Sequence, residues 1–155
     1  MKVALGVIAA LAAIAVVAVS TIGAPALTFL VTYGCHGAED QLAESMKAHR
    51  IFETYPPGAQ AQGQRESTCD DDDRVVDVSQ EYRLPSSRDD VIDFYRKLAL
   101  RDGWKPSPEM READDFCFTK AIDGKDTDLT VWTGDESDTF YVGLSSSIES
   151  GGWWC

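Results

Sequence analysis

A long uncharged run near the amino terminus constrains this chain more than any other feature. Residues 3–31 contain no charged side chain and are mostly Ala, Val, Leu and Ile. A helix needs about 20 such residues to cross a bilayer, and at about 1.5 Å per residue this run would reach roughly 43 Å. We therefore expect residues 1–34 to form an uncleaved signal-anchor, a transmembrane helix.

Two other interpretations of the run remain open. A cleaved signal peptide has an apolar core of about 7–15 residues followed by a small-x-small site. Residues 24–26 (Ala-Pro-Ala) fit that site, although the apolar run continues past them, and cleavage there would give a secreted protein. A lipoprotein signal would end at Cys35, but residues 32–34 lack the leucine that such signals usually carry three positions upstream.

The charges beside the run predict its orientation. Lys2 precedes the run and the first basic residue after it is Lys47, so the positive-inside rule places the amino terminus in the cytoplasm and residues 35–155 outside the cell membrane. All 26 acidic residues, and all of the 14 basic residues except Lys2, follow the run. Such an acidic surface repels phosphate backbones, which argues against a nucleic-acid partner.

Four cysteines follow the apolar run, at positions 35, 69, 117 and 155. An even count in an exported segment is typical of disulfides. We expect the pairs Cys69–Cys117 and Cys35–Cys155, because a sheet that contains the neighbouring strands can bring Cys69 and Cys117 together. The two outermost cysteines are then left as partners.

The Cys35–Cys155 pairing also predicts where the carboxyl-terminal sequence GGWWC lies. A bridge from Cys155 to Cys35 would bring the tail to the bilayer surface. Trp153, Trp154 and Tyr33 would then lie at the membrane interface, where aromatic side chains are favoured. In the alternative, the two tryptophans pack under the sheet as additional core.

The exported part begins with a predicted juxtamembrane helix within residues 35–58. Apolar side chains recur at three- and four-residue spacing over residues 38–53, and Tyr-Pro-Pro-Gly ends the pattern. Residues 59–73 are polar and have no period, which predicts a loop or linker.

The extracytoplasmic domain itself is predicted over residues 74–155. Residues 74–84 alternate between apolar and polar side chains, which indicates a strand with one wet face. Residues 86–104 predict a helix with Ser86 or Ser87 as its N-cap and Gly103 at its carboxyl end. Three further strands are expected over residues 116–122, 128–133 and 139–146, joined by hairpin turns.

One helix with an apolar stripe and four strands predict an α+β two-layer domain. The helix should cover the dry face of a four-stranded, mainly antiparallel sheet. At this size the aromatic residues are needed for the core. The expected core aromatics are Phe94, Tyr95, Trp104, Phe116, Phe118 and Trp132.

The stretch SSRDDVIDFYRKLALRDGW resembles a pattern found in small exported or membrane-anchored bacterial proteins of unknown function. In these proteins a strand leads to SxxxVxxFYxxxLxxxGW and then to a short meander. The resemblance covers roughly residues 74–145. It implies a fold and a location, but no activity and no catalytic residue.

No constellation of residues points to catalysis or to a resident metal. An EF-hand loop that starts at Asp70 would need glycine at its sixth position, which is Val75, so Asp70–Asp73 suggest at most weak calcium binding. No GxSxG motif and no phosphate-binding glycine loop occur. We expect no cofactor, and a non-catalytic domain that binds a protein or cell-envelope partner or has a structural role in the envelope. The alternative is a secreted enzyme or ligand-binding protein.

Overall fold

The computed structural model describes residues 33–85, 87–107, 116–133 and 138–148. The chain divides into two compact units, Met1–Gly34 and Cys35–Cys155. Apart from Tyr33, every described residue that is discussed below belongs to the second unit.

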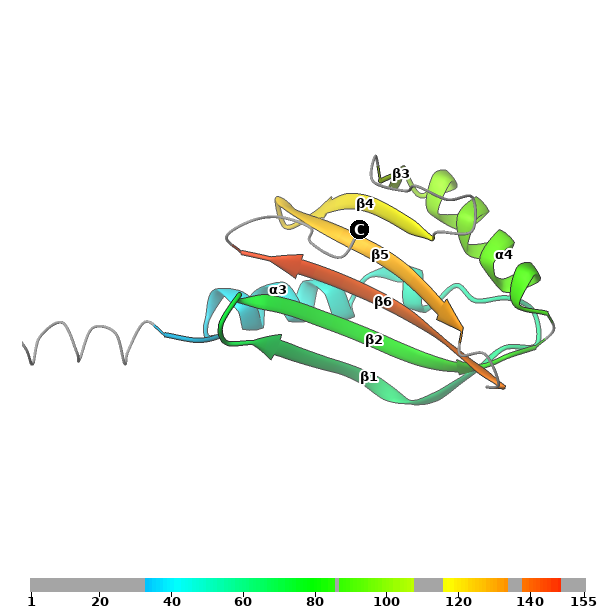
Figure 1. The fold of residues 1–155 in the computed structure, drawn as a ribbon, viewed down its shortest axis with the longest axis horizontal. Helices are drawn as coiled ribbons and strands as arrows, with labels where there is room; N and C mark the ends of the chain where they lie inside the picture. Colours follow the sequence, from blue (N-terminus) through cyan, green and yellow to red (C-terminus); the bar gives the residue numbers. More distant parts are fainter. Residues whose placement is uncertain (1–32, 86, 108–115, 134–137, 149–155) are drawn as a thin grey trace, which may run out of the picture. The chain divides into compact units, whose positions relative to one another are not determined.

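The second unit contains a six-stranded sheet whose paired strands are all antiparallel, in the order β1-β2-β6-β5-β4-β3. The strands are β1 (Gln60–Asp70), β2 (Val75–Arg83), β3 (Lys105–Pro106), β4 (Cys117–Ile122), β5 (Lys125–Thr133) and β6 (Thr139–Ser147). The helices are α3 (Ala38–Lys47), the 3₁₀ helix η2 (Arg50–Phe52) and α4 (Arg88–Arg101). Figure 1 shows the long strands side by side, with α3 behind the sheet.

The predicted fold class was wrong in the number of strands and helices. The sheet has six strands instead of four, and two α-helices instead of one contribute to the domain. One additional strand, β1, occupies most of residues 59–73, which were expected to be a loop. Because β1 is an edge strand with no buried position, its sequence lacks the alternation that marks a half-buried strand.

The predicted transmembrane helix, signal-anchor and single-pass membrane location are also corrected. Among residues 33–85, 87–107, 116–133 and 138–148, no helix is long and apolar enough to cross a membrane. The longest helix there, α4, has 14 residues and carries several charges, whereas a span needs about 20 apolar residues. The run over residues 3–31, on which these predictions depended, lies outside the described residues.

Helix α4 begins and ends where its sequence predicts. The Ser87 side chain caps the first turn by accepting a hydrogen bond from the Asp90 N–H at 3.2 Å. At the other end Gly103 has φ of 82°, a conformation that glycine adopts without strain. The Trp104 N–H then bonds back to the Ala99 carbonyl at 3.0 Å, which completes a Schellman motif.

Both α-helices contribute to one core on one face of the sheet. The alternation of β2 is confirmed, because Val76, Val78 and Tyr82 are buried while the residues between them are more exposed. Buried residues of both helices join these side chains in a single cluster. From the helices, the members are Leu42, Met46, Val91, Tyr95, Leu98 and Ala99. The other face of the sheet carries the alternate side chains, among them Trp132 and Tyr141.

Candidate functional site

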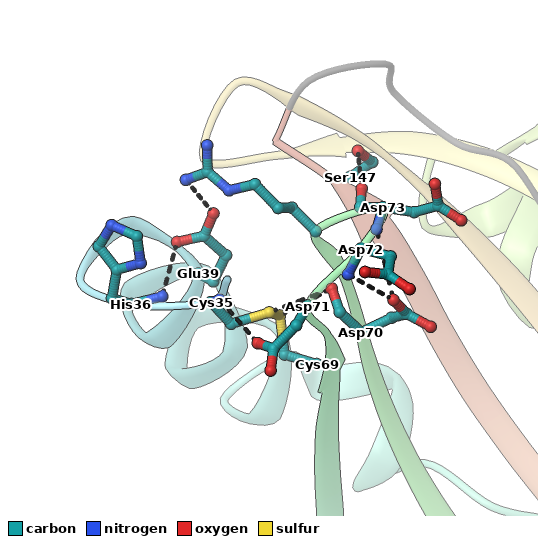
Figure 2. Close-up of a disulfide and its surroundings, with 10 residues drawn as sticks. Cys35, His36, Glu39, Cys69, Asp70, Asp71, Asp72, Asp73 and Ser147 are labelled. Carbon is teal, nitrogen blue, oxygen red and sulfur yellow. Dashed lines mark hydrogen bonds and ion pairs between the residues drawn. A yellow bond between two sulfur atoms is a disulfide. The ribbon is translucent and has the colours of Figure 1, made fainter. Parts of the chain in front are cut away.

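The predicted disulfide pairing was wrong. Cys35 is joined to Cys69, with a Cα–Cα distance of 6.2 Å (Figure 2). Cys69 ends an edge strand, whereas Cys117 begins β4, which is separated from β1 by β2, β6 and β5. Four steps of about 4.8 Å between neighbouring strands exceed the separation of about 7 Å that a disulfide tolerates.

The remaining predicted site residues lie partly outside the described residues. Cys117 is disulfide-bonded as well, but its partner is not among the described residues. Cys155, Trp153 and Trp154 also lie outside them. The membrane-interface position of the two tryptophans stays a prediction, but the Cys35–Cys155 bridge from which it was derived is excluded, because Cys35 pairs with Cys69. Tyr33 is described, and its side chain is half exposed.

The side chains of the aspartates that follow Cys69 accept hydrogen bonds from backbone N–H groups. Asp71 accepts the Cys35 N–H at 2.9 Å, and Asp70 accepts the N–H groups of Asp72 and Asp73 (Figure 2). These bonds form an Asx-type turn between β1 and β2. In the part of the chain that the structure describes, no group of three or more His, Cys, Asp or Glu side chains is arranged to hold a metal ion.

A buried ion pair completes this end of the domain. Glu39 in the first turn of α3 is 1% exposed, forms an ion pair with Arg74, and accepts the His36 N–H at 3.2 Å (Figure 2). Burial acts to raise the pKa of Glu39, but backbone N–H groups and Arg74 together hold it below its ordinary value. The disulfide and this pair therefore attach α3 to the β1–β2 hairpin.

A different region has the features of a binding site, and its centre is Trp132. This side chain is 62% exposed, although the sequence analysis placed it in the core. It lies directly opposite Tyr141 on the open face of the sheet. The two ring centroids are 5.6 Å apart, with 36° between the ring planes. The signal was present in the sequence, since Trp132 alternates with Leu129 and Val131, which form the core.

Trp132 forms one wall of a hollow of about 540 Å³, which we call the α4–β5 hollow. Its lining residues are Arg88, Asp89, Ile92, Asp93 and Arg96 from α4, and Val131, Trp132 and Thr133 from β5. The volume is within the usual range of about 300–1,000 Å³ for small-molecule sites.

The hollow exists because β5 extends beyond β4. Pairing between these strands ends at Thr130, which faces Cys117. The last residues of β5 pair with β6 but, among the described residues, with no strand on the β4 side. The amino-terminal half of α4 lies beside this open strand end and supplies the polar wall.

The lining of the α4–β5 hollow joins charged side chains to one large aromatic ring. It combines two guanidinium groups, two carboxylates and one indole, and its lining includes no His, Cys or Ser. Asp93 pairs with Arg96 at 3.3 Å, and its side chain is 60% exposed.

A second hollow of about 260 Å³, which we call the bulge hollow, lies beside Tyr141. Its lining residues are Gln62, Gly63, Gln64 and Glu66 of β1, Ser79 and Glu81 of β2, and Tyr141 of β6. It arises from a β-bulge, because three residues of β1 between Gln62 and Glu66 face the single residue of β2 between Glu81 and Ser79. Gly63, at φ of 67°, permits this distortion.

Tyr141 is fixed in place by its neighbour on β2. Its hydroxyl donates a hydrogen bond to Glu81 Oε1 at 2.9 Å. This bond, with some burial and the nearby negative charges, raises the pKa of Tyr141 above its ordinary value. The phenol therefore stays neutral, and its ring position is set by a charged partner.

Comparison with known proteins gives no match: no family model fits the sequence, and neither a curated protein nor a solved structure is similar to it. The resemblance of residues 74–145 to small exported bacterial proteins therefore stays a prediction.

Proposed function

We propose that this chain is an exported, non-catalytic binding domain whose ligand lies in the α4–β5 hollow against Trp132. The observation that carries the proposal is the exposed indole in the wall of a cavity of ligand size. Tryptophan and arginine are the residues that most often anchor ligands and partners, and both line this hollow.

The energy available from the indole is substantial. If a ligand covers roughly 100 Å² of the ring, at about 25 cal/mol per Å², the contact contributes about 2.5 kcal/mol. A factor of ten in affinity corresponds to about 1.4 kcal/mol. Removing the ring is then expected to weaken binding by on the order of 50-fold.

Export is supported by the cysteine chemistry. None of the three cysteines that the structure describes is free, and the bridge between Cys35 and Cys69 links α3 to the hairpin. Disulfides of this structural kind form and persist in oxidising compartments outside the cytoplasm.

A fragment screen on the full-length protein tests the proposal. Amide chemical shifts are recorded while a library of small polar and aromatic fragments is added. Binding fragments should shift the amides of residues 88–96 and 131–133. Trp132→Ala should remove the effect, whereas Leu100→Ala, which alters another exposed apolar side chain on α4, should leave it intact.

Two outcomes would contradict this function. If fragments bind only at other residues, or if no fragment binds, the α4–β5 hollow is not the binding site. Chemical conversion of a bound fragment after prolonged incubation with stoichiometric protein, observed by mass spectrometry, would instead favour the secreted-enzyme alternative.

A further inference from the structure

We propose that the ligand is a neutral oligosaccharide, which crosses the open face of the sheet from the α4–β5 hollow to the bulge hollow. This inference rests on the proposed function and names the ligand class of that site. Three properties of the surface support it: continuity, charge and hydrogen-bonding capacity.

The two hollows are connected through one row of side chains. Trp132 lines the first hollow and Tyr141 lines the second, and their rings are in contact. The sheet register continues this row through Glu81 to Gln62. Three steps between four neighbouring strands, at about 4.8 Å each, give a path of about 14 Å. Such a path suits a chain of several sugar units better than a single compact molecule.

The charges along the path argue against an anionic ligand. The α4–β5 hollow has two arginines and two aspartates in its lining, whereas Glu66 and Glu81 line the bulge hollow without a basic residue. In the described part of the chain neither glutamate forms an ion pair with Lys or Arg. Arg83, two residues beyond Glu81, is the nearest cation along β2. A polyanion would be repelled at the bulge hollow, whereas a polycation finds no net attraction in the α4–β5 hollow, where two aspartates balance Arg88 and Arg96.

The polar groups match hydroxyl groups, which both donate and accept hydrogen bonds. Arginine guanidinium groups supply donors, aspartate and glutamate supply acceptors, and the amides of Gln62 and Gln64 supply both. An apolar ligand would remove water from these polar groups without replacing its hydrogen bonds, at a cost. The exposed area of the Trp132 ring, with the Tyr141 ring packed beside it, offers apolar surface to the C–H groups of a sugar ring, while the sugar hydroxyls reach the polar groups nearby.

Titration of the full-length protein with a defined ligand panel tests the inference. The panel holds neutral tetrasaccharides of glucose, xylose and N-acetylglucosamine with their monosaccharides, an oligogalacturonate as the anionic probe, and hexalysine as the basic-peptide probe. We expect at least one neutral tetrasaccharide to bind more tightly than its monosaccharide. Trp132→Ala and Tyr141→Ala should each weaken that binding about 10-fold or more.

Matched variants separate the ring from the hydroxyl. Tyr141→Phe keeps the ring and removes the bond to Glu81, so it should weaken tetrasaccharide binding less than Tyr141→Ala. Leu100→Ala should have no effect. All variants should remain folded, because none removes a residue of the buried core. The thermal midpoint of each variant measures the loss of the Trp132–Tyr141 contact separately from the loss of binding.

The remaining outcomes would overturn the inference. Tetrasaccharide binding that depends on Trp132 but not on Tyr141 would refute the path between the hollows. Preferential binding of hexalysine would identify a basic peptide as the ligand. Preferential binding of oligogalacturonate would identify an anionic saccharide as the ligand. If the fragment screen locates a site at the α4–β5 hollow and no saccharide binds, the ligand class is wrong and the proposed function stands. If nothing binds at that hollow, both are wrong.

Discussion

Two buried tyrosines that pack on the same ring should respond oppositely to loss of their hydroxyl groups. Tyr82 and Tyr95 are both fully buried, and their ring centroids lie 5.1 and 5.9 Å from that of Phe140. The Tyr82 hydroxyl donates a hydrogen bond to the Phe52 carbonyl oxygen. The Tyr95 hydroxyl is buried without a hydrogen-bond partner among the residues that the structure describes.

The expected magnitudes follow from this difference. Tyr82→Phe leaves a buried carbonyl without its donor, which costs about 1–3 kcal/mol of unfolding free energy. Tyr95→Phe removes a desolvated group that has no partner, so the change should be neutral or stabilising by up to about 1 kcal/mol. Ring packing is the same in both variants, so the hydroxyl environment alone sets the difference.

Urea denaturation of the oxidised protein measures both effects. The slope of free energy against urea concentration should stay constant while the midpoint changes. Tyr82→Phe should lower the midpoint, and Tyr95→Phe should leave it unchanged or raise it. The reasoning fails if Tyr95→Phe is the more destabilising of the two.

Three further predictions concern titration and the disulfides. Burial and two nearby cations lower the pKa of His49 below 6.5. The unfolded state therefore binds more protons than the folded state, and the free energy of unfolding should fall as pH drops below about 6.5. In His49→Asn, whose side chain can still accept the Ile51 N–H, the free energies of unfolding at pH 5 and pH 7 should differ less than in the wild type. Replacing Cys35 and Cys69 together by serine should cost about 3–4 kcal/mol, the chain-entropy value for a sequence separation of 34; denaturation without added reductant would show this, and an unchanged midpoint would refute it. Non-reducing peptide mapping should join the Cys117 peptide to the peptide that ends the chain, because Cys35 and Cys69 are already paired; a free thiol at Cys117 would contradict this.

Local signals in the sequence were sufficient for the central elements. For α4, the N-cap at Ser87, the apolar stripe and Gly103 are all within the helix or adjacent to it, so no distant contact is needed to define its ends. The alternation of β2 likewise predicts which of its faces is buried, and the structure confirms it. These elements agree with prediction because local preference and tertiary environment favour the same conformation.

The failures involve features that depend on partners distant in the chain. Strand β1 is held by backbone pairing with β2 at the sheet edge, and its side chains show almost no periodic burial. Two-residue β3 exists only as a pairing partner of β4. The disulfide depends on strand order, since Cys69 lies opposite Val76 at one edge and Cys117 lies near the other. Strand order is a global property that spacing of cysteines does not encode.

Strand β5 contributes both to the buried core of the domain and, through Trp132, to its exposed surface. Leu129 and Val131 of β5 are in the core, whereas Trp132, with the opposite orientation, is 62% exposed and contacts Tyr141. A domain of this size has little stability to spare, and its core already contains Trp104, Phe118 and other aromatics. An exposed indole contributes little to that core, and water around it is unfavourable. A ligand in the α4–β5 hollow, as proposed above, would cover this ring.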